Sequence, residues 1–180
     1  MNRLQFIDAI KPACLAAESI HGIPWGWLVA QAIQESGGYG LSELSVKAHN
    51  LYGIKGNDYM QGNVGYASFP TWTEAIMFQG WQLNVQRYLP FKPLVVAGKF
   101  KEYGDAISKA GWCPVSKPTY GSMIQDIAEM YNLLPKPVVV LSEAQQWAVD
   151  NGIVNEPVDW REKADRNVIA WMIYKSRGKV

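Results

Sequence analysis

The sequence has few cysteines, no excess of charge of either sign and no long hydrophobic run. Its 17 lysine and arginine residues nearly balance 16 aspartate and glutamate residues, which leaves a formal net charge of +1. This balance gives no strong attraction to nucleic acid or to an anionic membrane, and the basic stripes typical of nucleic-acid-binding proteins are missing. No window of about 18 residues is apolar throughout, so we expect no segment to span a membrane.

The two cysteines, Cys14 and Cys113, lie far apart in the sequence. Their separation matches no metal-ligand spacing and no redox pair, and no cluster of His, Cys and Asp residues has ligand spacing. We therefore predict no metal site and no cofactor. Two buried free thiols are the favoured interpretation, with a disulfide as the alternative.

Apolar residues make up 48% of the chain and charged residues 18%. This composition excludes a disordered chain, which would have fewer apolar residues and more net charge. A length of 180 residues is enough for one hydrophobic core and a small appendage. Tryptophan and tyrosine are abundant, with 8 and 9 copies, and their flat, partly polar side chains suit both cores and sugar-binding grooves.

The spacing of apolar residues predicts a mostly helical α+β domain with one small β element in residues 57–69. Pro12 is expected to bend the first helix or to mark a restart. Thr71 and Glu74 have the pattern of a capping box at a helix start. Helices are expected at residues 5–21, 25–36, 42–48, 71–88, 93–110, 118–133, 142–151 and 160–176.

Glu35 is the residue that most directly suggests chemistry. It ends an otherwise apolar helix, and a glycine-rich stretch follows it. The dipole at a helix C-terminus disfavours an anion, and apolar neighbours disfavour it further, so both raise the pKa of a carboxyl group. A glutamic acid that is protonated near neutral pH is the general acid that glycosidic cleavage requires. The alternative is an ordinary surface glutamate at a helix end.

A longer stretch around Glu35 carries a family resemblance. Residues 30–44 read AQAIQESGGYGLSEL, and residues 48–56 read AHNLYGIKG. Together they resemble the signature of the bacterial N-acetylglucosaminidase family, A-Q-A-x-L-E-S-G-W-G-x-S-x-L-A followed by N-N-L-F-G-I-K. That family includes autolysins, flagellar muralytic enzymes and phage lysins. Further similarities extend the resemblance to about residues 5–133.

The resemblance implies a lysozyme-like fold with a groove between two lobes. It makes Glu35 the acid that protonates the glycosidic oxygen. Tyr120 matches the tyrosine of the family's closing motif, which lies near the catalytic glutamate and is implicated in catalysis, although a core tyrosine is the alternative. The substrate-binding residues expected by resemblance are Asn50, Tyr52, Trp112 and Tyr39.

Three positions depart from the family pattern. Gly38 stands where the family often has Trp, which would change one wall of the groove, and His49 replaces a common Asn. Many members carry a second carboxylate in the β-lobe, but residues 56–70 contain only Asp58. Either Asp58 positions water as a second catalytic group, or the 2-acetamido group of the substrate acts as nucleophile.

Two regions are predicted, a catalytic domain at 1–136 and a small helical tail at 137–180. The tail, from Ser142 through Trp147 to Tyr174, resembles part of a surface-layer-homology-type segment. This resemblance implies attachment to the cell wall. The alternative is a helical hairpin that packs on the catalytic domain, because a segment this short is near the lower limit for independent folding.

The sequence thus predicts a monomeric peptidoglycan hydrolase, an endo-β-N-acetylglucosaminidase that cuts the β-1,4 bond between N-acetylglucosamine and N-acetylmuramic acid. A lysozyme or lytic transglycosylase and an inactive wall-binding module are the alternatives. Residues 1–8 lack the apolar segment of a signal peptide. We therefore expect a phage or prophage lysin, released by phage lysis or carried in a virion.

Overall fold

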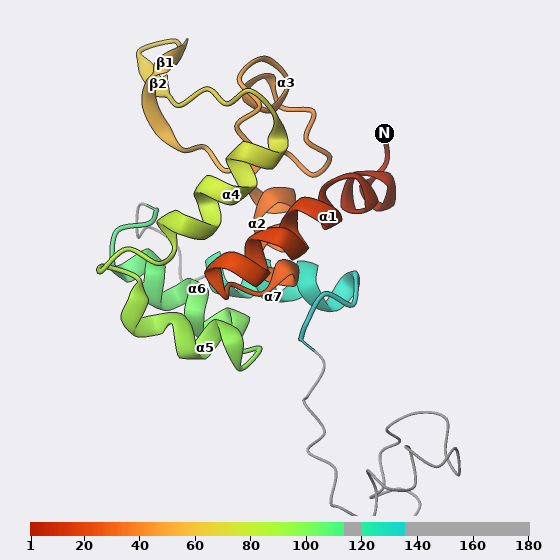
Figure 1. Cartoon of the computed structure of the whole chain (residues 1–180), viewed down its shortest axis with the longest axis vertical. Coiled ribbons are helices and arrows are strands. Elements are labelled where there is room, and N and C mark those ends of the chain that lie inside the picture. The colour runs from red at the N-terminus through yellow and green to blue at the C-terminus, as the bar shows by residue number, and fades with distance from the viewer. Residues whose placement is uncertain (114–119, 136–180) are drawn as a thin grey trace, which may run out of the picture. The chain divides into compact units, whose positions relative to one another are not determined.

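The computed structural model describes residues 1–113 and 120–135 of the chain. Seven α-helices, one short 3-10 helix and a two-stranded sheet are found in these residues (Figure 1). The predicted tail helices, the tail hairpin and the domain boundary at residue 136 lie outside them. The elements are α1 (Arg3–His21), α2 (Trp25–Glu35), α3 (Glu43–Lys47), β1 (Lys55–Gln61), β2 (Val64–Tyr66), α4 (Trp72–Gln82), η1 (Leu89–Phe91), α5 (Lys92–Val96), α6 (Phe100–Lys109) and α7 (Tyr120–Met130).

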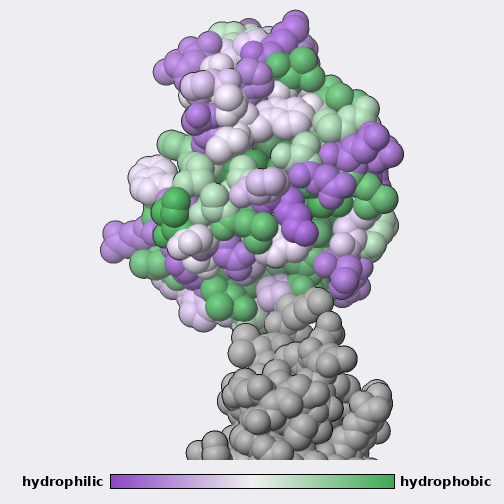
Figure 2. Space-filling model, turned by 45° about the vertical axis from the view of Figure 1, so that its right-hand side comes forward, coloured by the Kyte–Doolittle hydropathy of each residue, from purple (hydrophilic) through white to green (hydrophobic). Residues whose placement is uncertain are grey.

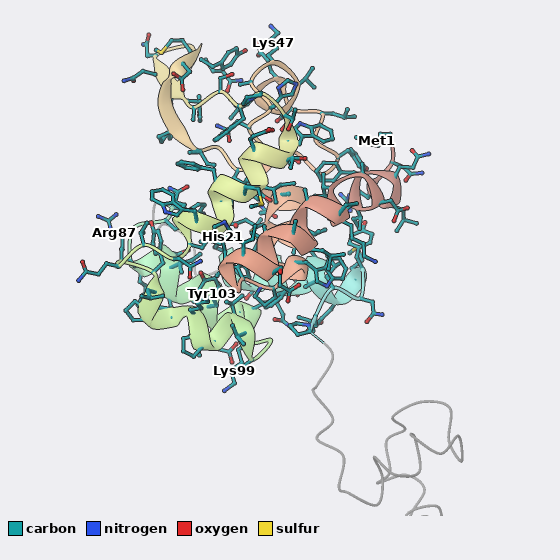
Figure 3. All side chains as sticks on the ribbon, viewed as in Figure 1. Met1, His21, Lys47, Arg87, Lys99 and Tyr103 are labelled. Carbon is teal, nitrogen blue, oxygen red and sulfur yellow. The ribbon has the colours of Figure 1, made fainter. Side chains whose placement is uncertain are left out.

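Helix α2 forms the centre of the core. Every residue from Gly26 to Ile33 is buried, which is expected of a helix that is apolar on all sides. Helices α1 and α7 both pack against it. Trp27 is fully buried, and its ring meets the rings of Phe100 and Tyr103 edge-on, with centroids 5.4 and 4.6 Å apart. Tyr103 accordingly lies inside the helical body in Figure 3.

A pair of glycines lets α6 and α7 approach closely. A Cβ atom on Gly104 would lie only 2.5 Å from the Cα atom of Gly121, so neither position has room for a side chain. This crossing fixes the start of α7 against the helical body. It therefore also fixes Tyr120, the residue directly before Gly121.

Strands β1 and β2 form an antiparallel hairpin that is separate from the main core. The turn at Gly62 has a φ of 62°, a conformation that glycine adopts at little cost. The predicted β element is thus confirmed, although it begins at Lys55. Figure 1 shows the hairpin and α3 at one end of the described part of the chain, with α5 and α6 at the other. Hydrophilic residues dominate the hairpin end of the surface in Figure 2.

The structure differs from the sequence predictions at several places within and at the ends of helices. Helix α1 runs without a restart through Pro12. Helix α4 ends at Gln82 rather than near residue 88. The expected helix at 93–110 is divided into α5 and α6, because Gly98 takes a φ of 74° between them. Thr71 does cap α4, but its hydroxyl donates to the Glu74 carboxylate, so the two residues do not form the reciprocal capping box.

Within residues 1–113 and 120–135, no helix is both long and apolar enough to cross a membrane.

Candidate active site

Glu35 is the last residue of α2 and lines a groove of about 590 Å³. One wall of the groove comes from the loop at 52–55 and from the hairpin residues Gln61 and Tyr66. The opposite wall comes from residues after α4 and from residues 111–113. The groove thus lies between the β hairpin and the helical body, as the lysozyme-like prediction requires.

A chain of hydrogen bonds runs from the core to the Glu35 carboxyl group. The Tyr120 hydroxyl donates to Glu35 Oε1 at 2.9 Å. Gln31 Nε2 donates to the same Tyr120 hydroxyl at 2.9 Å. Gln31 Oε1 in turn accepts from Trp27 Nε1 at 3.2 Å and from Gln79 Nε2 at 2.9 Å. The chain therefore joins α2, α4 and α7 beneath a single carboxyl group.

Burial raises the pKa of the Glu35 carboxyl group, and hydrogen bonds from Tyr120 and Trp112 oppose this rise. The net shift is upward, in the direction expected from the sequence, with desolvation as its main cause. A raised pKa keeps more of the carboxyl group protonated near neutral pH. The direction of the shift favours the protonated form, which is the form that a general acid needs.

Tyr120 and Trp112 are the two predicted site residues that the structure brings to Glu35. Tyr120 begins α7 and contacts Glu35 through its hydroxyl, which favours the site interpretation over that of a plain core tyrosine. Trp112 lines the groove and packs edge-on against Tyr88, with centroids 5.8 Å apart. The two rings give the groove an aromatic wall beside the acid.

Asn50, predicted to contact substrate, is not among the residues that line the described groove. Its side chain is 1% exposed. Both amide hydrogens are used, on the carbonyls of Ile54 and Ala67 at 2.9 Å, and its oxygen accepts from the backbone of Tyr52 and Ile54. A side-chain amide has no further hydrogen-bonding capacity. Asn50 therefore fixes the shape of the loop that carries Tyr52.

Tyr52 and Tyr39, both predicted to bind substrate, lie in different places relative to the groove. Tyr52 lines the groove but is 3% exposed, and its hydroxyl donates to the Leu28 carbonyl at 3.3 Å. It is thus a floor residue with little surface for a sugar. Tyr39 is not among the residues that line the described groove; its ring lies beneath the Arg3 guanidinium, 5.3 Å from its centroid. Arg3 also lies beside Gly38, which is buried away from the groove wall.

Asp58 is exposed on β1, and its carboxylate accepts from the Ser68 backbone at 3.3 Å. Among the residues that line the described part of the groove, Glu35 is the only carboxylate. The structure therefore does not bring Asp58 together with Glu35. His49 binds the Phe69 carbonyl at 2.9 Å through Nδ1, which fits a structural role.

Sequence reasoning missed Gln31, Gln79, Arg87 and Cys113 at the site. Arg87 and Cys113 line the groove, and the two glutamines lie beneath it in the core. Gln31 lies within the stretch at residues 30–44 that carries the family resemblance, and this position is the one sequence feature that points to a role at the site. No sequence pattern distinguishes Gln79 from a solvent-facing residue of α4.

A helical body, a β hairpin and a half-buried glutamic acid in the groove between them define the lysozyme-like fold class. The chain belongs, within that class, to the glucosaminidase family. The family model, described as mannosyl-glycoprotein endo-beta-N-acetylglucosaminidase, matches residues 11–133.

Individual relatives agree with this assignment. The chain is 30% identical over 151 residues to the exo-glucosaminidase LytG of Bacillus subtilis, which covers 71% of this chain and 51% of that protein. The chain thus spans about half the length of this curated relative.

Two solved structures share the fold. The catalytic domain of the autolysin Auto from Listeria monocytogenes has a TM-score of 0.54 at 23% identity, covering 73% of this chain and 85% of that one. A peptidoglycan hydrolase from Sphingomonas sp. A1 has a TM-score of 0.54 at 18% identity, covering 86% of this chain and 98% of that one.

Proposed function

We propose that this protein is a peptidoglycan hydrolase that cleaves the β-1,4 bond between N-acetylglucosamine and N-acetylmuramic acid, with Glu35 as general acid. The observation that carries the proposal is the half-buried Glu35 carboxyl group, held by Tyr120 in a groove between two lobes. The family membership and the names of the relatives, an exo-glucosaminidase and peptidoglycan hydrolases among them, support the substrate class.

The groove supplies one half of the reaction. Protonated Glu35 donates its proton to the glycosidic oxygen, the bond from that oxygen to the sugar C1 breaks, and water finally adds to C1. Positive charge develops at C1 as this bond breaks. The group that then bonds to C1 is either the 2-acetamido group of the substrate or water that Asp58 positions. Glu35 recovers its proton from the water that adds.

The charge of the groove wall favours a substrate that carries carboxylates. Lys55 and Arg87 line the groove, and neither is in an ion pair within residues 1–113 and 120–135. Lys55 Nζ lies 4.0 Å from the centroid of the Tyr66 ring, and Figure 3 labels Arg87 on the loop beyond α4. Peptidoglycan carries carboxylates on its stem peptides, whereas a pure N-acetylglucosamine polymer carries none.

The test is the chemical identity of the new chain ends. Purified cell walls are digested with the full chain, reduced with borohydride and hydrolysed, and the sugar alcohols are identified by mass spectrometry. We expect glucosaminitol. Reduced muramic acid would instead indicate a lysozyme, and 1,6-anhydro-muramic ends a lytic transglycosylase.

The same digest distinguishes endo from exo cleavage. The family description names an endo-enzyme, and the Bacillus subtilis relative is named an exo-enzyme. We propose endo cleavage, which gives a broad distribution of glycan lengths at early times. Release of only the terminal unit from the outset would establish the exo mode.

Expression in cells with and without a holin tests release by phage lysis.

A further inference from the structure

The polar side chains beneath Glu35 have roles that their partners determine. The indole Nε1–H of Trp27 can only donate, so the atom of Gln31 that faces it, 3.2 Å away, must be the carbonyl oxygen. Gln79 Nε2 donates to the same oxygen at 2.9 Å. The NH₂ end of the Gln31 amide therefore points in one direction only, toward Tyr120.

This orientation determines where the Tyr120 proton goes. Gln31 Nε2 lies 2.9 Å from the Tyr120 hydroxyl oxygen and donates to it. The hydroxyl hydrogen cannot point back at a donor, and its remaining partner is Glu35 Oε1 at 2.9 Å. Gln31 and Trp27 are fully buried, so bulk water does not compete for the bond between them that fixes the orientation of the Gln31 amide.

We propose that Gln31 is a positioning residue, whose amide turns the Tyr120 hydroxyl so that its proton is donated to Glu35 Oε1. Oε1 is then held as an acceptor, and the proton that the acid delivers is carried on Oε2. The side-chain amide of Gln31 bonds to Trp27, Gln79 and Tyr120 and not to the Glu35 carboxyl group, so it acts on that group through Tyr120. The catalytic consequence of this role rests on the proposed function of Glu35 as general acid.

The arrangement also sets the acidity of Glu35. The hydrogen bond from Tyr120 lowers the pKa of Glu35 against the larger effect of burial, and donation from Gln31 makes the Tyr120 hydroxyl a stronger donor. Loss of the Gln31 amide therefore weakens the bond to Oε1 and raises the pKa of Glu35 further. The other titratable or charged side chains on the groove wall are Tyr52, Lys55, Tyr66, Arg87, Tyr88 and Cys113.

The test follows the Glu35 carboxyl carbon by NMR during a pH titration of the full chain. The variants are Gln31→Met, Tyr120→Phe and the double variant, with Gln79→Met as matched control. Gln79 is a buried amide of the same cluster that does not contact Tyr120, so its loss reports the general cost of disturbing the cluster.

We expect Gln31→Met to raise the pKa of Glu35 by about half a unit, the size expected for a weakened hydrogen bond. Tyr120→Phe should raise it more, and the double variant should equal Tyr120→Phe. Gln79→Met should shift it by clearly less than Gln31→Met. The alkaline limb of the wall-lysis pH profile should move by the same amounts. An unchanged pKa in Gln31→Met, or an undiminished shift in the Tyr120→Phe background, would overturn the proposal.

A second measurement needs no Gln31 variant, in case Gln31→Met does not fold. The Gln31 side-chain NH₂ resonances should titrate with the pKa of Glu35 in the wild type, and this response should disappear in Tyr120→Phe. Its presence in both proteins, or its absence in the wild type, would refute the coupling. The NMR titrations need no glycan, so they test the role of Gln31 independently of activity. A wild-type protein that fails to cleave walls would contradict the proposed function but not the positioning of Tyr120 by Gln31.

Discussion

The region beneath Glu35 and the β hairpin use polar side chains in opposite ways. Under Glu35 the hydrogen-bond partners are buried or half-buried and distant in sequence, with Gln31 and Tyr120 separated by 89 positions. Near the hairpin the polar contacts are exposed, as in the ion pair of Glu43 with Lys47 and the bond from Tyr59 to Glu43. Exposed pairs of this kind contribute little to stability, because water competes for both partners.

This difference indicates how the work of the site is divided. Polar groups that bond to one another inside the core hold a side chain in one geometry before substrate arrives, which is what acid catalysis needs. The exposed side chains of the hairpin can adapt to a bound polymer, but they do not fix a single group in one geometry. We therefore place the chemistry on the helical body and treat the hairpin as a wall of the groove.

The largest expected effect comes from removing the acid. Glu35→Gln should lower the rate of wall lysis by about 10²–10⁴-fold, because the amide cannot donate the required proton. Turbidity loss on purified walls measures the rate, and circular dichroism checks the fold. Glu43→Gln, an exposed glutamate of α3, is the matched control and should keep near-normal activity. A Glu35→Gln rate above a tenth of the wild-type rate would contradict the assignment.

Tyr120→Phe should have the next largest effect, a loss of about 10–100-fold in the rate of lysis. The hydroxyl that holds Glu35 Oε1 is removed, while the ring and its packing at the start of α7 remain. The rate is measured at the pH optimum of each protein, so that the shifted pKa of Glu35 does not enter the comparison. Turnover equal to that of the wild type would return Tyr120 to the role of a core residue.

Asn50→Ala tests the exception to this comparison, because Asn50 is a buried polar group near the hairpin, where the other polar contacts are exposed. Its loss removes the Asn50 bonds of the Ala67 carbonyl and of the Tyr52 and Ile54 N–H groups, and we expect the free energy of unfolding to fall by about 3 kcal/mol. Urea denaturation measures it. Asn57→Ala, on the exposed surface of β1, is the control and should change stability by less than about 0.5 kcal/mol. Equal effects would mean that the loop does not depend on the Asn50 amide.

The contrast between Glu35 and Asn50 also shows what the sequence could predict. Glu35 could be found because two signals coincide, the end of an apolar helix and a long family resemblance. Asn50 lies in the same resemblance, yet its amide is used on its own loop, as asparagine side chains in turns often are. Pattern matching identifies such a position but does not reveal whether its side chain faces substrate or backbone.

The network beneath the acid was beyond sequence reasoning for a different reason. Gln31 and Gln79 are 48 positions apart, and no sequence pattern pairs them. Only the packing of α2 against α4 and α7 shows that both face inward. The division of residues 93–110 into two helices was likewise missed, because one glycine in a helical pattern is a weak signal.

The raised pKa of Glu35 gives a stability effect with a definite sign. The folded protein holds this proton to a higher pH than the unfolded chain, whose glutamate pKa is near 4.5. Between the two pKa values the folded state binds more protons, so its stability falls as pH rises. Glu35→Gln removes this cost and should give a higher Tm than the wild type at pH 7. The difference should vanish below about pH 4, and a lower Tm at pH 7 would contradict the burial argument.

Asp58→Asn should have the smallest effect and decides what the hairpin contributes. Asp58 is exposed and bonded to the Ser68 backbone, and its amide replacement keeps an oxygen that can accept the same bond. If the acetamido group of the substrate is the nucleophile, the rate of lysis should change less than about twofold, within the range of an ordinary surface substitution. If Asp58 positions the attacking water, the loss of its charge should instead lower the rate by about 10²-fold or more. The second result would move half of the chemistry onto the hairpin, and the hairpin would then have to close toward Glu35 when substrate binds.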